Sequence, residues 1–419
     1  MNILKKADSI IKTKDGKVLL SNFMWLSLLQ IAGYIFPLIT IPYLADIIGP
    51  VGFGRISFSL SVMVWLYTIT DWGFNFIGTR EITKNRNNPI IVSDIFSKII
   101  WAKSLLCIVV LLLLLLLIRY IPIFNENKIP LMVAFISVPG HIMYPDWFFQ
   151  GLERMKYVTI LNLISKTIFT IAIFIFIKEK DDYIFQLLFI SCGYIFSGLI
   201  AMYVIIWKWK YQLRFVKISD VFTTLQGGTD VFLNNIVRNL WNSLGIVLLG
   251  VFSGEVANGI LSAGRKFSEI VERFVGVITR VFFPFLTRKS EKHSEYAKYS
   301  LIIATIIMCL CYIGAPFFIK CFFNEEFYSA IPVARLFSFS ILFYSLSDVY
   351  GKNYLIVKGY ERILRNITLI CSVITFIFMI PLIYYFSFLG ATISFLIGIG
   401  SIGITSWLFA RKLKKSNAV

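Results

Sequence analysis

The sequence predicts an all-α integral membrane protein with twelve transmembrane helices in two six-helix bundles and with both termini in the cytoplasm. Three observations predict this fold class. Hydrophobic residues make up 58% of the 419 residues and charged residues only 15%, against roughly 45–50% and 25% in soluble domains. Apolar stretches of about 20 residues, enough to cross the hydrocarbon layer, recur along the chain. Lys and Arg are concentrated in every second loop between these stretches.

The apolar stretches are predicted to be helices, because lipid offers no hydrogen-bonding partner to the backbone. The alternating apolar and polar pattern of a barrel strand is absent from the sequence. Residues 1–20 contain five lysines without the short apolar core and cleavage site of a signal peptide, so the apolar run from Phe23 is interpreted as the first span. The predicted spans are residues 23–43, 55–74, 98–118, 130–149, 157–177, 183–206, 230–252, 265–285, 299–319, 330–350, 364–384 and 388–409.

These spans divide the chain into five predicted parts. The two six-helix bundles are expected at residues 23–206 and 230–410, joined by a cytoplasmic linker at 207–229. A cytoplasmic amphipathic segment (1–22) precedes them, and a basic cytoplasmic tail (411–419) follows.

Basic residues alternate between the two sides of the predicted membrane. The N-terminus, five loops and the C-terminal tail on one side contain 27 Lys and Arg, whereas the six loops on the other side contain 5. Short loops rich in Lys and Arg stay in the cytoplasm, so both termini are predicted to be cytoplasmic. The net charge of +18 is therefore attributed to membrane orientation, and no nucleic-acid partner is expected.

Two short motifs recur once in each half of the chain. Gly49-Pro-Val-Gly-Phe-Gly-Arg55 joins the first two spans, and Ser253-Gly-Glu-Val-Ala-Asn-Gly259 joins the seventh and eighth, about 205 residues later. Gly151-Leu-Glu-Arg after the fourth span matches Gly359-Tyr-Glu-Arg after the tenth, 208 residues later. Chance recurrence in loops is the alternative explanation. Two similar separations instead predict parallel six-helix repeats, related by an axis along the membrane normal.

Polar side chains repeat along single faces of several predicted spans. In the fifth span Asn162, Lys166 and Thr170 recur every fourth residue, which places them on one side of a helix. Comparable stripes in the seventh and eighth spans contain Arg238 among asparagines, and Lys266, Glu269, Arg273 and Arg280. Such stripes are expected to face a water-filled cavity or another helix.

Charged residues inside spans are costly, by roughly 2.5–3.5 kcal/mol at a helix centre. Five basic residues nearer the span ends are expected to snorkel to the interface: Arg55, Lys103, Arg265, Lys266 and Arg335. Ion pairs such as Glu269 with Arg273 would neutralise part of the remaining charge.

The excess of positive charge predicts a central cavity that attracts an anion. Arg and Lys suit phosphate groups. The candidate substrate-binding residues are Lys166, Arg238, Arg265, Lys266, Arg273 and Arg280, and the candidate cavity or ion-coupling carboxylates are Asp230, Glu269 and Glu272.

The glycine-rich stretch between the first two spans is assigned a mechanical role. Orientation places it on the outer side, and its glycine spacing differs from that of a nucleotide-binding loop. Gly49, Gly52 and Gly54 are predicted to form a turn that flexes as a hinge. No metal site is expected, because His141 and His293 lack partners at ligand spacing and the six cysteines lie in or beside apolar segments.

Nearly the whole chain resembles the bacterial polysaccharide-unit flippases of O-antigen type, within the multidrug, oligosaccharidyl-lipid and polysaccharide exporter superfamily. The residues that carry the resemblance are Gly49-Pro-Val-Gly-Phe-Gly-Arg-Ile-Ser-Phe58 and Asp146-Trp-Phe-Phe-Gln-Gly-Leu-Glu-Arg-Met-Lys-Tyr157, together with the two-half layout. The resemblance implies a MATE-like arrangement of two bundles around a central cavity. In contrast to the related lipid II flippases, the first span has no basic residue between Phe23 and Tyr43, so no substrate contact is transferred from them.

The resemblance also implies a function. It implies a multi-pass protein of the bacterial inner membrane that moves an undecaprenyl-pyrophosphate-linked oligosaccharide to the outer leaflet by alternating access, for O-antigen or capsule biosynthesis. The expected partners are this anionic lipid-linked substrate, membrane lipids and the polysaccharide polymerase machinery. No enzymatic activity and no cofactor are implied, other than a coupling cation, H⁺ or Na⁺.

Other functions are weighed against this one. An ion-coupled drug or cation antiporter of the same superfamily would favour acidic residues in the cavity, whereas the interior here is basic. A membrane glycosyltransferase or polymerase would need carboxylates in a sizeable outer loop, but the predicted outer loops have only about 3–12 residues. An ATP-driven flippase would carry a Gly-x-x-x-x-Gly-Lys-Ser/Thr motif, which the sequence lacks.

Overall fold

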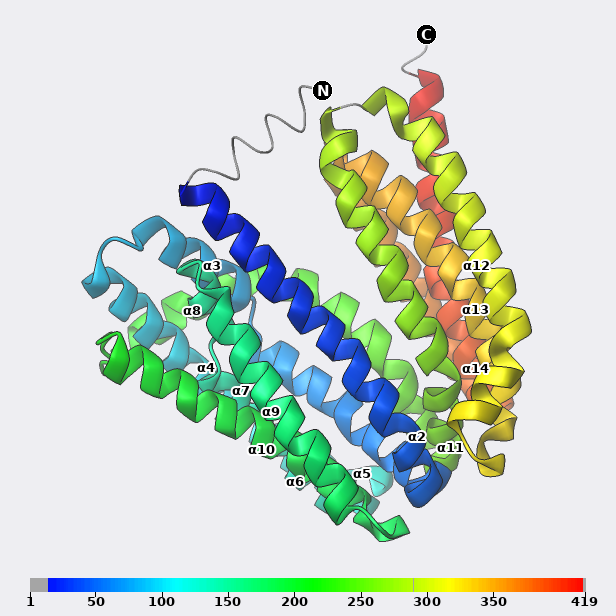
Figure 1. Ribbon diagram of the computed structural model, residues 1–419, viewed down its shortest axis with the longest axis horizontal. Helices are drawn as coiled ribbons and strands as arrows, with labels where there is room; N and C mark the ends of the chain where they lie inside the picture. The colour runs from blue at the N-terminus through cyan, green and yellow to red at the C-terminus, as the bar shows by residue number, and fades with distance from the viewer. Residues whose placement is uncertain (1–13, 289, 417–419) are drawn as a thin grey trace. The chain divides into compact units, whose positions relative to one another are not determined.

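The computed structural model describes residues 14–288 and 290–416, and every regular element within them is a helix (Figure 1). Eight helices in this part of the chain are long and apolar enough to cross a membrane. The all-α membrane architecture predicted from the sequence is thus confirmed. Residues 14–22 of the predicted N-terminal segment form the first turns of a long helix, and the rest of that segment lies outside the described residues.

The helices of the first half are α2 (Lys14–Asp71), α3 (Phe74–Asn85), α4 (Pro89–Tyr120), α5 (Pro122–Glu126), α6 (Lys128–Phe135), α7 (Ser137–Met143), α8 (Asp146–Gly151), α9 (Met155–Phe176), η1 (Lys180–Asp182), α10 (Tyr183–Tyr203) and the π-helix η2 (Val204–Lys208). Those of the second half are α11 (Ile218–Arg288), η3 (Ser290–Lys292), α12 (His293–Phe322), η4 (Glu325–Ala330), α13 (Ile331–Leu346), the π-helix η5 (Ser347–Ile356) and α14 (Glu361–Ser416).

The helices form two compact units. Unit 1 contains the residues up to Tyr43 together with Val62–Asn239, and unit 2 contains Leu44–Ser61 together with the residues from Leu240 onward. The sequence predicted a boundary between the two bundles within the linker at 207–229. The observed units differ from this, because residues 44–61 belong to the same unit as the second half of the chain. The linker is also shorter than expected, since α11 already begins at Ile218.

Two of the longest helices bend at equivalent glycines. In α2 the helix is interrupted at Gly49 (φ 61°, ψ −174°), and in α11 it is interrupted at Gly254 (φ 80°, ψ −172°), 205 residues later. Positive φ is accessible to glycine at little cost, whereas a Cβ would strain it. The loops predicted at 44–54 and 253–264 are therefore too long, because each is a short turn at one glycine. The helix continues to Ile48 and resumes at Pro50, whose missing N–H is harmless in a first helical turn.

The second repeated motif also has equivalent geometry in the two halves. Glu153 (φ 58°) and Gly359 (φ 80°) each end a helix in the left-handed conformation. In each case the following amide donates to a carbonyl five residues back, from Arg154 to Phe149 and from Tyr360 to Leu355. This is the hydrogen bond of a Schellman turn. The equivalent residues are therefore 206 positions apart, and the predicted alignment of Gly151 with Gly359 is wrong by two residues.

The helix ends follow local sequence signals. At the start of α4, the Asn88 side chain accepts hydrogen bonds from the amides of Ile90 (3.1 Å) and Ile91 (3.3 Å), while Pro89 takes the first helical position. These contacts satisfy two of the amide groups that a helix start leaves unpaired. The helix ends at Tyr120, two residues before Pro122.

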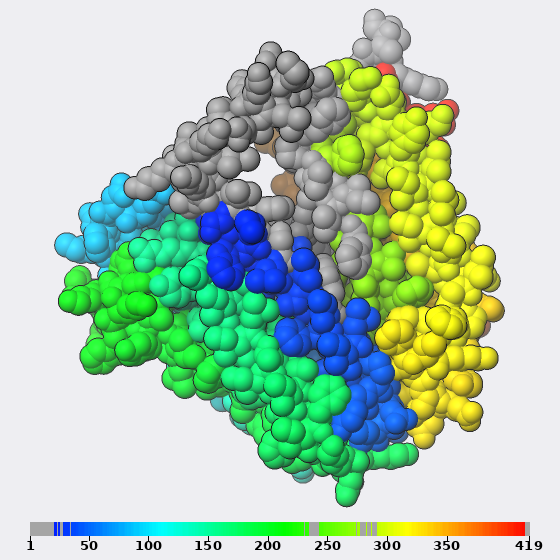
Figure 2. Space-filling view, viewed as in Figure 1, coloured from blue at the N-terminus to red at the C-terminus, as the bar shows by residue number. Residues whose placement is uncertain are grey.

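The outer face of α12 shows how the apolar surface is used. This helix, in yellow in Figure 2, exposes a row of large apolar side chains: Ile302, Ile303, Ile306, Leu310, Ile313 and Phe317. Such a continuous apolar face would be unfavourable in water but is suited to contact with lipid tails.

Candidate functional site

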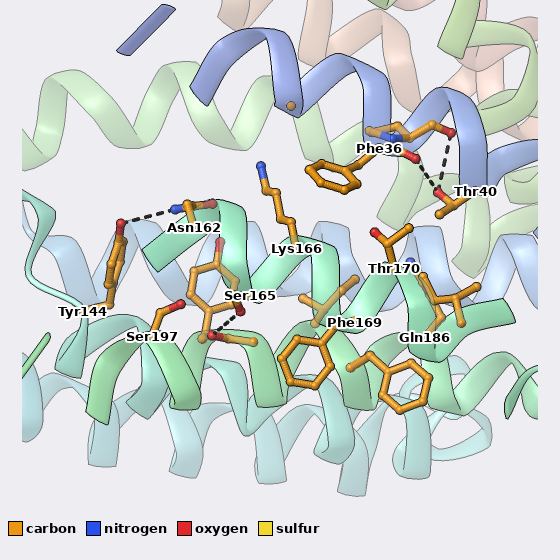
Figure 3. A pocket seen from close by; sticks show the side chains of 17 residues that line it. Phe36, Thr40, Tyr144, Asn162, Ser165, Lys166, Phe169, Thr170, Gln186 and Ser197 are labelled. Atoms are coloured by element: carbon orange, nitrogen blue, oxygen red, sulfur yellow. Dashed lines mark hydrogen bonds between the residues drawn. The ribbon is translucent and has the colours of Figure 1, made fainter. Parts of the chain in front are cut away.

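A cavity of about 320 Å³ lies inside unit 1 (Figure 3). Its walls come from three helices, represented by Phe36 of α2, Lys166 of α9 and Gln186 of α10, and Tyr144 before α8 lies at one end. All of these residues belong to unit 1.

The polar stripe predicted along the fifth span faces this cavity. Asn162, Lys166 and Thr170 of α9 all line it, as their spacing of four residues requires. Asn162 is held in place because its Nδ2 donates to the Tyr144 hydroxyl at 3.3 Å. That hydroxyl in turn donates to the Val158 carbonyl at 2.9 Å. The wall of the cavity therefore presents fixed polar groups from a single helix face.

The rest of the lining includes aromatic rings and the side-chain amide of Gln186. Phe36 faces the cavity from α2, while Phe169 of α9 and Phe189 of α10 are stacked with ring centroids 6.1 Å apart. Gln186 of α10 also lines it, and its Oε1 atom is buried without a hydrogen-bond partner among the described residues. A buried acceptor of this kind gains from a ligand hydroxyl, because leaving it unsatisfied has a cost.

A second polar feature of unit 1 is a buried charge cluster at the end of α2. Lys103 of α4 is 1% exposed, and its Nζ lies 2.7 Å from Oδ1 of Asp71. The other Asp71 oxygen accepts a hydrogen bond from Asn75 at 3.2 Å. His141 Nδ1 lies 3.7 Å from Asp71 Oδ1, and its ring packs 5.6 Å from that of Tyr194, which also lines the cavity.

This cluster was not predicted from the sequence. Lys103 was expected to snorkel to the interface, which is wrong because its side chain turns inward to Asp71. The two residues lie on different spans, 32 positions apart, so no helical spacing indicates the contact. One signal was available: an acidic residue, Asp71, lies near the end of the second predicted span, and Lys103 lies near the start of the third.

In unit 2 the predicted charged stripe of α11 is a network of ion pairs. Glu269 Oε1 lies 2.5 Å from Arg273 Nη2, and Glu269 Oε2 lies 3.7 Å from Lys266 Nζ. The predicted pair of Glu269 with Arg273 is confirmed. One carboxylate thus faces two cations, which leaves this helix face with net positive charge.

Two further predicted residues lie beside this network. Arg265 stacks on aromatic rings, with its guanidinium carbon 4.2 Å from the centroid of Phe395 and 5.9 Å from that of Phe337. Contact with ring faces stabilises a cation without neutralising it. Glu272 instead accepts a hydrogen bond from the Ser340 hydroxyl of α13. The side chains of Arg238, Arg280 and Asp230, also predicted from the sequence, lie outside the described residues.

The two glycine turns of unit 2 meet at a close seam. A Cβ on Gly54 would lie 1.8 Å from the Glu255 carbonyl oxygen, and one on Gly259 would lie 2.1 Å from that of Pro50. Gly54 and Gly259 are equivalent residues of the two repeats, as are Pro50 and Glu255, since each pair is 205 positions apart. At this seam each repeated motif therefore packs against the other. Arg55 Nε, 3.2 Å from Glu255 Oε1, adds an ion pair to it.

The three predicted hinge residues therefore do not all lie in the turn. Gly49 is the residue of the turn, with positive φ. Gly52 and Gly54 instead lie in the helical part of α2 that follows, so the prediction that placed them in the turn is wrong. Gly54 serves close packing, because only a residue without a Cβ allows the backbones to approach this closely.

A family model described as "Polysaccharide biosynthesis protein" matches residues 19–290. Among curated proteins, the chain is 25% identical over 388 residues to an Escherichia coli K12 protein described as "Putative O-antigen transporter", covering 90% of this chain and 92% of that one. A Shigella dysenteriae protein of the same description is 25% identical over 382 residues, covering 90% and 96%.

Solved structures share the fold. The lipid II flippase MurJ, in an inward closed conformation, has a TM-score of 0.72 at 16% identity and covers 92% of this chain and 87% of its own. An inward-facing multidrug resistance MATE family transporter of the MOP superfamily has a TM-score of 0.71 at 12% identity, covering 94% and 98%. These likenesses establish the helical architecture, and the MATE-like fold predicted from the sequence is confirmed.

Proposed function

Because the chain belongs to the polysaccharide biosynthesis protein family, we propose that it moves a lipid-linked oligosaccharide from the cytoplasmic to the outer leaflet of a bacterial inner membrane. The two curated relatives are described as O-antigen transporters, which supports transport rather than enzymatic synthesis. The lipid to be moved is an undecaprenyl pyrophosphate, whose headgroup is anionic and whose chain remains in the bilayer. Fold alone does not decide the substrate.

The observation that carries the proposal is the basic face of α11. Lys266 and Arg273 share one carboxylate, Glu269, and Arg265 adds a third cation, which is stacked on Phe395. Positive charge within a membrane-spanning helix is expensive unless it binds an anion. Guanidinium groups bind phosphate oxygens through paired hydrogen bonds. This face suits a pyrophosphate better than the cationic substrate of a drug antiporter.

The finer topology is part of the proposal. Breaks at Gly49, Gly254 and Ser387 divide three of the eight long helices into two parts each. Together with α6 and α7, which cover most of the predicted fourth span, this supports twelve spans. The excess of Lys and Arg in alternate loops supports cytoplasmic termini. The Gly49 and Gly254 turns then lie on the outer side.

Alternating access is proposed to use the seam of unit 2. Its helices are held by close backbone contact and the Arg55–Glu255 pair, which are interactions that can part and reform. Flexing at Gly49 would accompany that separation. We further propose coupling to H⁺ or Na⁺, with Glu269 and Glu272 as the described carboxylates able to take up a cation.

Deleting the gene is expected to stop the appearance of the glycan at the cell surface. The lipid-linked unit should accumulate in the inner leaflet, because a large polar headgroup does not cross hydrocarbon unaided. Surface glycan is measured by lectin or antibody labelling, and the lipid-linked pool by extraction and mass spectrometry. Unchanged surface glycan in a strain without a second flippase would rule out the proposed function.

Replacing Arg273 by Ala is expected to lower export about tenfold or more, since a charge-assisted hydrogen bond to the substrate contributes roughly 1.5–3 kcal/mol. The measurement is surface glycan restored in the deletion strain, at matched protein level. Lys292→Ala is the control, because Lys292 pairs with Glu295 at 3.1 Å on an exposed surface and should export normally. Normal export by the Arg273 variant would remove this residue from the substrate site.

A further inference from the structure

We propose that the cavity of unit 1 binds one sugar ring of the transported oligosaccharide, and that this sugar is a hexuronate whose carboxylate is bound by Lys166. The inference rests on the proposed function and specifies the substrate class that one of its sites accepts. It follows from the size of the cavity, its aromatic walls, its hydrogen-bonding groups and its charge.

The dimensions favour a single ring. Small-molecule sites in proteins occupy about 300–1,000 Å³, and the volume here, about 320 Å³, is at the lower end of that range. A whole oligosaccharide unit would not fit. The cavity is bounded by α2, α9 and α10 (Figure 3).

The aromatic walls suit the faces of a pyranose. Phe36 lies on the α2 side of the cavity, while Phe169 and Phe189 form a stacked pair across α9 and α10 (Figure 3). The axial C–H groups of a sugar ring pack favourably on the electron-rich face of an aromatic ring. A simple apolar ligand would use these rings as well, so the polar groups decide between the two.

The polar groups of the cavity match hydroxyls. Gln186 offers a buried oxygen with no partner among the described residues, which can accept a hydrogen bond from a sugar O–H. Asn162 and Thr170 line the same space from α9. An acyl or polyprenyl chain would leave the buried Gln186 oxygen unsatisfied, at a cost of about 1–3 kcal/mol. A hydroxyl-bearing ring is therefore favoured over a lipid chain.

The charge indicates an acidic sugar. Among the described residues that line the cavity, Lys166 is the charged one, and none of them is a carboxylate. Its ammonium group crosses the cavity from α9 toward α2, where a Cβ on Gly33 would lie 3.9 Å from Nζ (Figure 3). In an apolar enclosure an ammonium interacts strongly with a carboxylate. A pyrophosphate would be served better by several cations, as in α11, than by a single lysine.

The test uses the full-length protein in lipid nanodiscs, titrated with methyl β-D-glucuronide and methyl β-D-glucoside. Binding is followed by saturation-transfer NMR of the sugar protons. We expect the glucuronide to bind at least about tenfold more tightly, the effect of one charge-assisted hydrogen bond. Lys166→Gln should abolish this preference and leave the glucoside affinity within about twofold. Phe169→Ala should weaken both ligands several-fold, because the stacking surface is lost.

Lys156→Gln provides the matched control. Lys156 lies on the same helix, with its ammonium 5.7 Å from the Trp25 ring, and it is not among the cavity residues. This variant should keep the full preference for the glucuronide. Equal binding of both glycosides by the unmodified protein would overturn the acidic specificity. Absence of saturation transfer to either glycoside would overturn the cavity as a sugar site.

Failure of this inference is distinguishable from failure of the proposed function. A protein that restores surface glycan in the deletion strain but binds neither glycoside contradicts the sugar site alone. A protein that binds the glucuronide through Lys166 but does not support export contradicts the transport function, and leaves the cavity assignment supported.

Discussion

Substituting alanine for Gly54 or Gly259 is expected to lower export in the deletion strain severely, while the same substitution at Gly314 should leave export unchanged. The difference follows from the space at each position. A Cβ at Gly54 or Gly259 would lie about 2 Å from a backbone oxygen, at 1.8 Å and 2.1 Å respectively, and backbone cannot move aside as a side-chain end can. No atom outside the helix lies within 4 Å of the Cβ position at Gly314 in α12. We expect at least a tenfold loss for the two seam variants.

A second measurement separates a failure to close the seam from a failure to fold. Asn258 is fully buried beside the seam, so Asn258→Cys should be shielded from a membrane-impermeant thiol reagent, in a background without the native cysteines. Adding Gly54→Ala should expose this cysteine while the protein remains in the membrane at normal amounts. Full export by both seam variants would show that close backbone contact is unnecessary for transport.

Replacing Lys103 by Met destabilises unit 1 by about 3 kcal/mol or more, the cost of removing one partner of a buried ion pair. Lys103 is almost completely buried and lies 2.7 Å from Asp71, so the variant removes the buried cation that pairs with this carboxylate. The measurement is the unfolding temperature of the detergent-solubilised protein, followed by size-exclusion chromatography after heating. A large decrease is expected.

Two further variants determine whether the charge is the cause. Lys103→Met combined with Asp71→Asn removes both charges and should recover most of the lost stability. Lys98→Met on the same helix breaks a partly exposed pair with Asp94, at 2.8 Å, and should cost at most about 1 kcal/mol. A double variant as unstable as Lys103→Met alone would assign the loss to packing instead of charge.

The repeated motifs show how far the sequence could predict the fold. The separation between the turns at Gly49 and Gly254 could be predicted from the sequence, because both turns place a glycine where φ is positive. At the second motif the equivalent residues are Glu153 and Gly359, and a glutamate gives no such signal. The alignment therefore followed the nearby Gly151 and was displaced by two residues. The length of each turn was overestimated because Pro50 and the residues after it are compatible with both a loop and a helix start.

The candidate sites were predictable where one helix carries them. The stripe of Asn162, Lys166 and Thr170 and the pair of Glu269 with Arg273 follow from helical spacing alone. Contacts between helices could not be derived in this way. The pairing of Lys103 with Asp71, and the meeting of α9 with α10 around a cavity, depend on tertiary packing that spacing within one span does not encode.

Transport of a lipid-linked oligosaccharide across the bilayer by this chain itself is tested most directly with the purified protein in liposomes that contain the undecaprenyl-pyrophosphate-linked unit extracted from the deletion strain. A membrane-impermeant glycosidase added outside measures the fraction of substrate in the outer leaflet over time. We predict that the protein brings the initially protected half of the substrate within reach of the enzyme, and that Arg273→Ala slows this about tenfold or more. Protection that persists equally in liposomes with and without the protein, at any imposed H⁺ or Na⁺ gradient, would contradict it.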